Sequence, residues 1–434
     1  MLRTIVLVLE TLLAPFAALG VLLSFAFSRR RGLLSSLFDE LPERLGGLSG
    51  EAKTKLAQRE IYWLHAASAG EIAGLAPLIE ALASRPDAPA LFVTTMTAAG
   101  RDAARKNPRI TWAQLAPLDA WPCVARLLSS LRAERLVLSE TELWPTLLIL
   151  SSRAGLRPML INARLTSLSL GRLRLVRGLL KPALDSLAQV GVQSEPEAAR
   201  FRALGMRAER VQVTGNCKYD QVAVPAADAE VYARLGRLGW GESPIFVAGS
   251  THPVEEDAVL AGFLQARTRL PSLKLVLAPR HPERSAEAWR SLVDASLHCA
   301  RWSRLGPGAN IPADTEAVLV DSLGVLAALY TRAAVAFVGG TLVPVGGHNL
   351  LEPALAGVPV LFGPYTSHIE LPATILEESR GGFRVRDASQ FADRLVELAG
   401  SPKKSREAGA RARQAAEALR GATARTLALL SGAK

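Results

Sequence analysis

Cysteine is scarce in this chain, and no two cysteines have the spacing of a disulfide framework or a metal site. The three cysteines, Cys123, Cys217 and Cys299, lie far apart, and no C-x-x-C pair is present. This spacing argues against a disulfide framework and against a zinc site. Aromatic residues make up only 6% of the chain, and no stacking or base-recognition motif accompanies its formal charge of +11. We therefore expect no nucleic-acid partner.

Motifs that hold a catalytic metal or cradle a nucleoside triphosphate are also missing. The sequence contains no P-loop lysine motif, no D-x-D, no H-E-x-x-H and no other carboxylate–histidine spacing typical of a metal centre. We expect no metal and no other cofactor, and a leaving group that departs without a divalent ion. A nucleoside monophosphate fits that expectation better than a diphosphate.

One long apolar run is present, at the N-terminus. Residues 5–27 are almost all apolar and are followed by Arg29, Arg30 and Arg31. As a helix rising about 1.5 Å per residue, such a run is long enough to cross a bilayer core. We expect residues 1–31 to be an uncleaved membrane anchor, with the arginines keeping the rest of the chain in the cytoplasm. A signal peptide and, because of Glu10 and Pro15, an interfacial helix are the alternatives.

A basic stretch lies at residues 160–181. It contains Arg164, Arg172, Arg174, Arg177 and Lys181, interleaved with leucines, and no acidic residue. This composition is typical of a surface that faces anionic lipid. An ordinary solvated helix face remains the alternative.

Apolar runs rich in β-branched residues alternate with helical stretches along the rest of the chain. They lie at residues 61–64, 91–95, 136–138, 159–161, 190–192 and 211–213, and again at 245–248, 273–277, 318–320, 335–338 and 358–361. The alternation predicts an α/β fold with parallel sheets. We expect two facing Rossmann-like domains, at residues 50–220 and 240–400, and a C-terminal helix at 401–434. A cleft would lie between them.

Residues 334–364 form the clearest nucleotide-binding pattern. Two apolar runs flank the glycine pairs at 339–340 and 346–347, and a short helix is expected to begin near Leu350–Glu352. Such a βαβ unit binds its ligand at the carboxyl end of the strands, where glycines let the backbone come close. Glu352, in the first helical turn, can accept hydrogen bonds from sugar hydroxyls.

In the first half, a possible general base follows the strand at 61–64. His65-Ala66-Ala67-Ser68-Ala69-Gly70-Glu71 leads from that strand into a helix, which places Glu71 at the ligand edge of the sheet. A carboxylate there could take a proton from an attacking hydroxyl group. We expect the helix dipole to lower the pKa of Glu71 and keep it ionised. The alternative is a glutamate that only stabilises the first turn of the helix.

Polar clusters follow several other strands. Glu140 and Glu142 follow one strand of the first half, where they could reach the rim of the cleft or cap the next helix, and Arg164 follows another. Arg164 is a candidate to bind a carboxylate or a phosphate. In the second half, residues 249–252, 279–284 and 321–324 each follow a strand. Together with the glycine-rich unit they carry donors suited to a phosphate, a ribose and a base.

Seven motifs, in order, resemble those of the 3-deoxy-D-manno-octulosonic acid (Kdo) transferase family of lipopolysaccharide biosynthesis. They are His65-x-x-Ser68-x-Gly70-Glu71, Ser139-Glu140-Thr141-Glu142-Leu143-Trp144-Pro145, Asn162-Ala163-Arg164-Leu165, Gly215-Asn216-x-Lys218, Gly249-Ser250-Thr251-His252, Pro279-Arg280-His281-x-Glu283-Arg284 and Gly346-Gly347-His348-Asn349-x-x-Glu352. The resemblance covers nearly the whole chain, including the N-terminal apolar run.

The resemblance implies an inverting glycosyltransferase of the GT-B fold. Such an enzyme transfers Kdo from CMP-Kdo to lipid IVA at the cytoplasmic face of the cell inner membrane, to which a single N-terminal span anchors it. By resemblance, Glu71 is the catalytic base, and Glu140 and Arg164 support the acceptor side. The matching CMP-binding residues are Pro279, Arg280, Leu323, Gly324, Val325, Asn349, Leu350, Leu351 and Glu352.

The chain departs from the family pattern at two places. Val325 stands where the family often has a glutamate, which leaves only backbone contacts at that position. Residues 166–169 are Thr-Ser-Leu-Ser, where a glutamate and an arginine usually follow the Asn-Ala-Arg-Leu motif. A sugar-nucleotide epimerase of the same architecture and a non-catalytic membrane-tethered module are the alternative functions. No motif reports how many Kdo residues are added or how the chain oligomerises.

Overall fold

The computed structural model describes residues 33–432, apart from 58 and 313. The expected membrane anchor at residues 1–31 therefore lies outside the described residues. Among the residues that are described, no helix is both long and apolar enough to span a bilayer. The chain divides into two compact units: one holds the residues up to Gln221 together with those from Arg420 onward, and the other spans Val222–Leu419.

The first unit is a seven-stranded sheet whose strands are all parallel, in the order β3-β2-β1-β4-β5-β6-β7. Its strands are β1 (Ile61–His65), β2 (Ala90–Thr95), β3 (Trp112–Leu115), β4 (Arg135–Ser139), β5 (Arg157–Ala163), β6 (Gln189–Val192) and β7 (Val211–Val213). The helices are α2 (Leu33–Arg44), α3 (Gly50–Leu56), α4 (Ala69–Gly74), α5 (Ala76–Ala83), α6 (Ala98–Arg105), α7 (Trp121–Ser130), α8 (Pro145–Arg153), α9 (Ser167–Leu175), α10 (Arg177–Ser186), α11 (Glu195–Leu204) and α20 (Ala422–Gly432), with 3₁₀ turns η1 (Ala208–Arg210) and η2 (Cys217–Gln221).

The second unit repeats this plan in the order β10-β11-β9-β8-β12-β13-β14, again all parallel. Its strands are β8 (Ile245–Thr251), β9 (Lys274–Pro279), β10 (Cys299–Arg301), β11 (Ala317–Leu319), β12 (Val335–Val338), β13 (Val360–Phe362) and β14 (Gly382–Arg384). The helices are α12 (Ala229–Gly236), α13 (Glu255–Arg267), α14 (Ser285–Asp294), α15 (Leu326–Tyr330), α16 (Leu351–Leu355), α17 (Glu370–Glu378), α18 (Ala388–Ala399) and α19 (Pro402–Ala418), with 3₁₀ turns η3 (Pro282–Arg284) and η4 (Trp302–Arg304).

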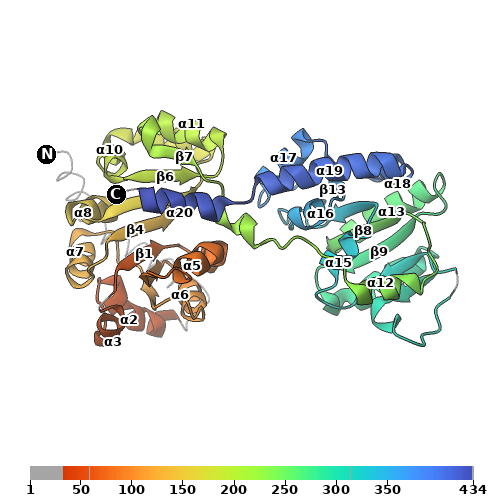
Figure 1. Cartoon of the computed structure of the whole chain (residues 1–434), viewed down its shortest axis with the longest axis horizontal. Helices are drawn as coiled ribbons and strands as arrows, with labels where there is room; N and C mark the ends of the chain where they lie inside the picture. Colours follow the sequence, from red (N-terminus) through yellow and green to blue (C-terminus); the bar gives the residue numbers. More distant parts are fainter. Residues whose placement is uncertain (1–32, 58, 313, 433–434) are drawn as a thin grey trace. The chain divides into compact units, whose positions relative to one another are not determined.

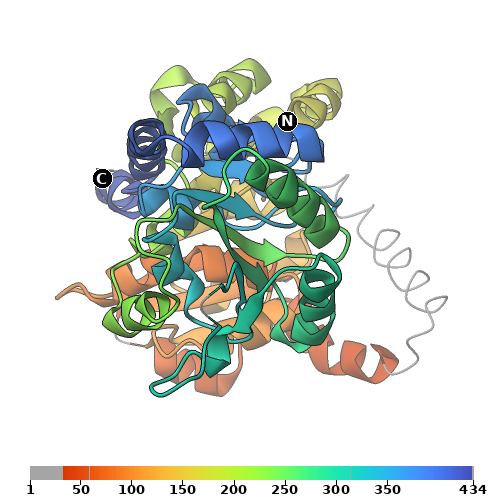
Figure 2. The ribbon, with the colours of Figure 1, turned by 90° about the vertical axis from the view of Figure 1, so that its right-hand side faces the viewer.

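Both sheets are buried on both faces, which explains why their strands are continuous apolar runs. On β1, Trp63 faces a core that includes residues of α7, α8, α10 and α11, whereas Tyr62 and Leu64 face a core that includes residues of α5 and α20. On β8, Phe246 packs toward α13 and α18, and Val247 packs toward α12 and α15. Helices thus cover both faces of each sheet (Figure 1 and Figure 2). The α/β fold with parallel sheets that we expected is confirmed.

The apolar runs of the sequence did not predict three strands, β3, β10 and β14. All three lie at an edge of their sheet, and they contain Gln114, Arg301 and Arg384 among only three or four residues each. An edge strand has a neighbour on one side only, so it need not be an uninterrupted apolar run.

The C-terminal stretch also differs from the single helix that we expected at 401–434. It forms α19 in the second unit and α20 in the first, divided at Gly421, whose φ of 80° is unfavourable for residues with a side chain. The carboxylate of Asp220 accepts hydrogen bonds from Gly421 N–H (2.6 Å) and Thr423 N–H (2.7 Å) and so caps the start of α20. An interruption of the helix at a single glycine cannot be inferred from helix-forming composition alone.

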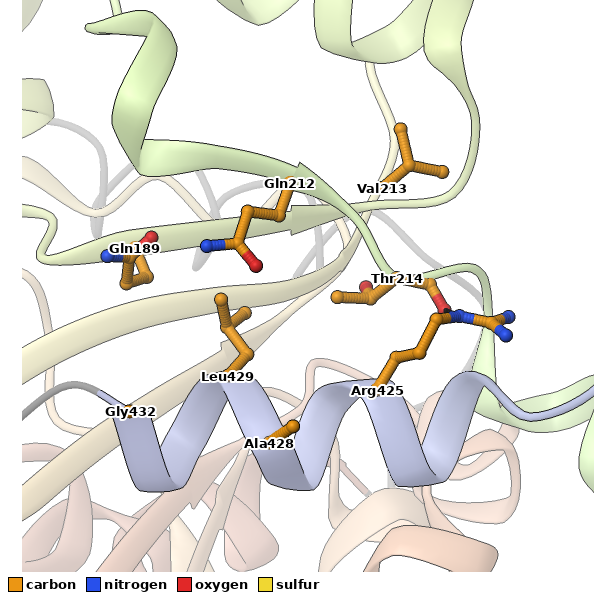
Figure 3. A pocket seen from close by; sticks show the side chains of 8 residues that line it. All are labelled: Gln189, Gln212, Val213, Thr214, Arg425, Ala428, Leu429 and Gly432. Atoms are coloured by element: carbon orange, nitrogen blue, oxygen red, sulfur yellow. Dashed lines mark hydrogen bonds between the residues drawn. The ribbon is translucent and has the colours of Figure 1, made fainter.

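Helix α20 lies along β6 and β7 (Figure 3). The guanidinium group of Arg425 donates to the carbonyl oxygen of Thr214 (2.9 Å), and Leu429 packs within 3.1 Å of the position that a side chain would take at Gly191. A shallow hollow of about 300 Å³ remains beside these contacts. None of the residues that we expected in the active site lines it.

Candidate active site

Glu71 lies in the turn that leads from β1 into α4. Ser68 caps the helix: its Oγ accepts a hydrogen bond from Glu71 N–H (3.3 Å). In return, the Glu71 carboxylate accepts hydrogen bonds from Ala67 N–H (2.9 Å) and from the Ser68 hydroxyl (3.2 Å). This reciprocal arrangement is close to a capping box, so Glu71 does stabilise the first turn, as the alternative interpretation held. The same contacts also fix the carboxylate at the end of the strand.

The pKa of Glu71 contradicts our expectation that a helix dipole would lower it. Burial raises the pKa of this carboxyl to about 7, and the negative charges of Glu140 and Glu142 add to the rise, against the hydrogen bonds from Ala67 and Ser68. Helix α4 has only six residues, and desolvation outweighs the small dipole of so short a helix. A carboxylate with a pKa near the working pH is well matched to general base catalysis.

Two non-glycine residues near Glu71 have an uncommon backbone conformation. Glu140, directly after β4, has a φ of 60°, and Asn162, near the end of β5, has a φ of 49°. Asn162 is buried, and its Oδ1 accepts a hydrogen bond from Cys217 N–H (3.0 Å), which holds η2 against the end of β5. Such conformations cost free energy and are enriched at active sites.

Two cations accompany these carboxylates at the same edge. The pKa of Lys218 is lowered by desolvation, and it responds to the charges of both Glu140 and Arg164. The carbonyl oxygen of Arg164 accepts a hydrogen bond from the Thr141 hydroxyl (2.7 Å), which ties the loop after β5 to the loop after β4. The structure therefore brings Glu71, Glu140 and Arg164 together. It also places Lys218 there, a residue that the sequence marked only as part of the motif Gly215-Asn216-x-Lys218.

A chain of polar contacts lies behind Glu71 and ends on Glu142. Trp63 Nε1–H donates to Thr94 Oγ1 (2.8 Å), which is hydrogen-bonded to Nδ1 of the buried His65 (2.9 Å). Nε2 of His65 lies 3.6 Å from the Glu142 carboxylate, which also accepts a hydrogen bond from Trp144 Nε1–H. Burial alone would raise the pKa of Glu142, but His65 and Trp144 outweigh it and lower that pKa. Glu142 is thus held as a carboxylate.

The second unit has a cavity of about 390 Å³ at the carboxyl ends of its strands. It is lined by Ser250, Ala278, Pro279, Arg280, Val320, Ser322, Leu323, Gly324, Leu326, Ala327, Tyr330, His348, Asn349 and Glu352. Six of the residues that we expected to bind CMP are among them: Pro279, Arg280, Leu323, Gly324, Asn349 and Glu352. Val325 precedes α15 and does not line the cavity, and Leu350 and Leu351 are buried in the core beneath it.

Asn349 and Glu352 are paired at the start of α16. Asn349 Nδ2–H donates to Glu352 Oε1 (3.2 Å), and Asn349 Oδ1 accepts from Leu351 N–H (3.0 Å). Burial raises the pKa of Glu352, while Asn349 and Arg280 act in the opposite direction. The pair presents both a donor and acceptors to the cavity, as recognition of sugar hydroxyls requires.

We expected the glycine pairs at 339–340 and 346–347 to let the backbone come close to the ligand, but the structure gives these glycines a packing role. A Cβ atom on Gly339 would lie 2.2 Å from the carbonyl oxygen of Ser250, and one on Gly340 would lie 3.0 Å from the imidazole ring of His348. A Cβ on Gly346 would meet His368 at 2.7 Å. These positions are small because other parts of the chain come close to them, and no glycine of the two pairs lines the cavity.

The backbone N–H groups that follow β12 donate hydrogen bonds to one buried carboxylate. Glu255, only 1% exposed, accepts hydrogen bonds from Gly340 (2.7 Å), Thr341 (2.9 Å) and Leu342 (2.7 Å) through their N–H groups. It also accepts one from His252 N–H (3.0 Å). One side chain therefore joins the loop after β8 to the loop after β12. In the sequence it was merely one of three acidic residues at the start of a helix.

The comparisons with known proteins agree with this geometry. A family model described as 3-deoxy-D-manno-octulosonic-acid transferase (kdotransferase) matches residues 39–221. A 3-deoxy-D-manno-octulosonic acid transferase of Bordetella pertussis is 34% identical, over 92% of this chain and 92% of the relative. One from Haemophilus influenzae is 30% identical, over 87% and 88%. A bifunctional glycosyltransferase/methyltransferase of Fusobacterium nucleatum is 30% identical, but this chain spans only 52% of its length.

Solved structures share the fold at much lower identity. The Anabaena protein HepE in complex with UDP aligns over 86% of this chain and 100% of its own, with 14% identity and a TM-score of 0.55. The UDP-GlcNAc 2-epimerase of Neisseria meningitidis bound to UDP-GlcNAc aligns over the same shares, with 12% identity and a TM-score of 0.51. At these identities the likeness extends to the fold alone.

Proposed function

We propose that this chain, which belongs to the 3-deoxy-D-manno-octulosonic acid (Kdo) transferase family, transfers Kdo from CMP-Kdo to lipid IVA in lipopolysaccharide core synthesis. The 34% identity to the Bordetella pertussis transferase over nearly all of both chains carries the choice of reaction. The GT-B fold, in which two Rossmann-like domains face each other, is part of this proposal. It is supported by the two parallel seven-stranded sheets.

Glu71 is the catalytic base of the proposed reaction. The acceptor hydroxyl oxygen attacks the anomeric carbon of Kdo, and its proton passes to the Glu71 carboxylate. The bond from the anomeric carbon to the phosphate oxygen breaks, and its electron pair leaves with CMP. The attack takes place opposite the leaving group and inverts the anomeric centre. The pKa of about 7 supports this role, because Glu71 is then both basic enough to accept the proton and partly ionised at neutral pH.

The other charged groups near Glu71 are proposed to bind the acceptor. Arg164 and Lys218 offer cations at the same edge of the sheet, and lipid IVA carries phosphates that such cations would bind. Glu140 lies close enough to influence the pKa of both Glu71 and Lys218. Its strained backbone supports a positioning role between the base and the cations.

The cavity of the second unit is proposed to hold the CMP part of the donor. Its volume of about 390 Å³ is within the range typical of small-molecule sites. Arg280 supplies a cation for the phosphate, and the Asn349–Glu352 pair supplies partners for the ribose hydroxyls. At Leu323 and Gly324, which line the cavity, the contacts would come from the backbone, whereas Val325 does not line it and carries no polar side chain.

We further propose that the chain acts at the cytoplasmic face of the cell inner membrane, anchored by residues 1–31. Helix α9 supports a membrane-facing surface on the first unit. None of its residues is buried, and Leu168 and Leu175 are 67% and 87% exposed beside the exposed side chains of Arg172 and Arg174. Exposed leucines among arginines are suited to an anionic lipid surface.

The test is product formation by the purified full-length chain. Incubated with CMP-Kdo and lipid IVA, it is expected to release CMP and to yield a lipid whose mass has grown by one or more Kdo residues, which mass spectrometry counts. Incubation with UDP-GlcNAc is the matched control for the epimerase alternative and is expected to leave the sugar nucleotide unchanged. Epimerised UDP-GlcNAc without any Kdo-bearing lipid would overturn the proposal.

A further inference from the structure

Two histidines beside the nucleotide cavity are joined directly to each other. Nε2 of His252 lies 2.7 Å from Nε2 of His348, and the two ring planes differ by only 7°. His348 lines the cavity, and His252 directly follows β8, the strand that supplies Ser250 to the cavity. Neither residue has a part in the reaction as described so far.

The short distance between the two nitrogen atoms determines where one proton lies. Two facing lone pairs would repel, and two facing N–H groups would clash, so a single proton must lie between them. One ring is therefore the donor through Nε2–H, and its Nδ1 has a free lone pair. The other ring accepts at Nε2 and carries its own proton at Nδ1. A further proton can bind at the donor ring's Nδ1 without breaking the bond between the rings.

Hydrogen bonds between the two loops hold the histidine pair in place. One oxygen of the buried Glu255 carboxylate accepts hydrogen bonds from both His252 N–H and Gly340 N–H. The N–H of His348 in turn donates to the carbonyl oxygen of Gly339 (3.2 Å). A Cβ atom at Gly340 would lie 3.0 Å from the His348 ring, which is tighter than an ordinary contact. The two imidazoles thus meet because one carboxylate connects their loops and a glycine leaves room for one of them.

The surroundings of the pair hold it neutral. Burial lowers the pKa of His348 to about 4, and the neighbouring His252, Arg280, His281 and His368 act in the same direction. The pKa of His252 is lowered by burial and by His281, Arg284 and Arg280, with only Glu255 opposing. The neighbours that face the pair are therefore mostly cations or groups that can become cations. A doubly negative phosphate among them would reverse the balance and favour protonation.

We propose that the His252–His348 pair binds one additional proton when a nucleoside monophosphate occupies this cavity, so that an imidazolium ion faces the phosphate. The inference rests on the proposed function, which assigns the CMP part of the donor to the cavity. When the bond to Kdo breaks, the phosphate gains one negative charge. A proton taken from solvent by the pair offsets that charge beside the leaving group.

Proton uptake can be measured without turnover. The full-length chain is titrated with CMP by calorimetry at pH 7, in two buffers of different ionisation enthalpy, so that the difference in heat gives the protons bound per CMP. We expect at least about half a proton per CMP, and a dissociation constant that rises with pH above 7. CMP itself contributes little, because its phosphate is almost fully ionised at this pH. Cytidine, which has no phosphate, should bind without proton uptake.

Three variants, with a fourth in reserve, and a matched pair of controls decide the source of the proton. His348→Gln and His252→Gln should each bring proton uptake close to zero, and Gly340→Ala, which presses on the His348 ring, should reduce it. Thermal unfolding checks that the variants fold, and His348→Asn takes the place of His348→Gln if that variant does not. His281→Gln and His368→Gln should keep the uptake. CMP binding without proton uptake in the unaltered chain, or uptake that persists in all the ring and glycine variants, would overturn the proposal alone. Failure to bind CMP at all would instead overturn the assignment of the nucleotide to this cavity.

Discussion

The two units have the same seven-stranded parallel plan and opposite chemistry at the edge where their strands end. The first unit gathers Glu71, Glu140 and Glu142, and the pKa of Glu71 rises to about 7. The second gathers Arg280, His252 and His348, and the pKa of His348 falls to about 4. Desolvation is the largest cause in both cases, and it favours the neutral form of each group. The first edge therefore suits the proposed base, and Arg280 in the second suits the proposed binding of the CMP phosphate.

The largest expected effect is a loss of turnover from a substitution at the edge of the first unit, with no loss of CMP binding at the edge of the second. Glu71→Gln removes the base while keeping an oxygen for the Ala67 N–H group, so we expect turnover to fall by about 10²- to 10⁴-fold. CMP binding should be unchanged, because the proposed nucleotide contacts lie in the second unit. Rates are measured as CMP release, and affinity by calorimetry. A variant that turns over normally would exclude Glu71 as the base, and a variant that loses CMP affinity would contradict the separation.

Much of this division could be predicted from the sequence, because strands buried on both faces are continuous apolar runs and polar clusters follow them. Glu71 and Arg280 were found in this way. The pKa of Glu71 could not be predicted, since it depends on burial and on Glu140 and Glu142, which follow another strand. The contacts made by Glu255 and the meeting of His252 with His348 were also inaccessible, because they join loops that lie about ninety residues apart.

The second prediction tests whether one carboxylate organises the donor edge. Glu255→Gln leaves an amide whose NH₂ group faces backbone N–H donors, so some of the four hydrogen bonds must be lost within a buried site. We expect the free energy of unfolding of the second unit to fall by about 2–4 kcal/mol. Urea unfolding measures the loss, and hydrogen exchange at residues 340–342 locates it.

The control for this variant lies nearby on the surface. Glu287→Gln removes an exposed partner of Arg284 and should cost less than about 0.5 kcal/mol. Equal losses in the two variants would show that the hydrogen bonds to Glu255 do not hold the loops together.

A third prediction compares the side chains that cap one helix in each unit. Asp220 caps α20 in the first unit, and Asp228 caps α12 in the second, where it accepts hydrogen bonds from Glu230 and Val231. Asp220→Ala and Asp228→Ala are therefore matched variants, each expected to cost roughly 1 kcal/mol. Local hydrogen exchange should increase around α20 in one and around α12 in the other. If both variants loosened both units alike, the division of the chain at 419–420 would have no energetic meaning.

The smallest expected effect lies within the acidic edge itself and concerns Glu142. Its carboxylate is held ionised by His65 and Trp144, and its charge raises the pKa of Glu71. A base works only when ionised, so the rate falls as the pH drops through the pKa of Glu71. Glu142→Gln removes a negative charge, which lowers that pKa, and the midpoint of the acid limb should move to lower pH by a fraction of a unit. The profile of kcat against pH measures this shift, with the exposed Glu80→Gln as a control that should not move it. A midpoint that stays in place would mean that Glu71 owes its basicity to burial and Glu140 alone, and the chain of contacts through His65 would then serve only the packing of the edge.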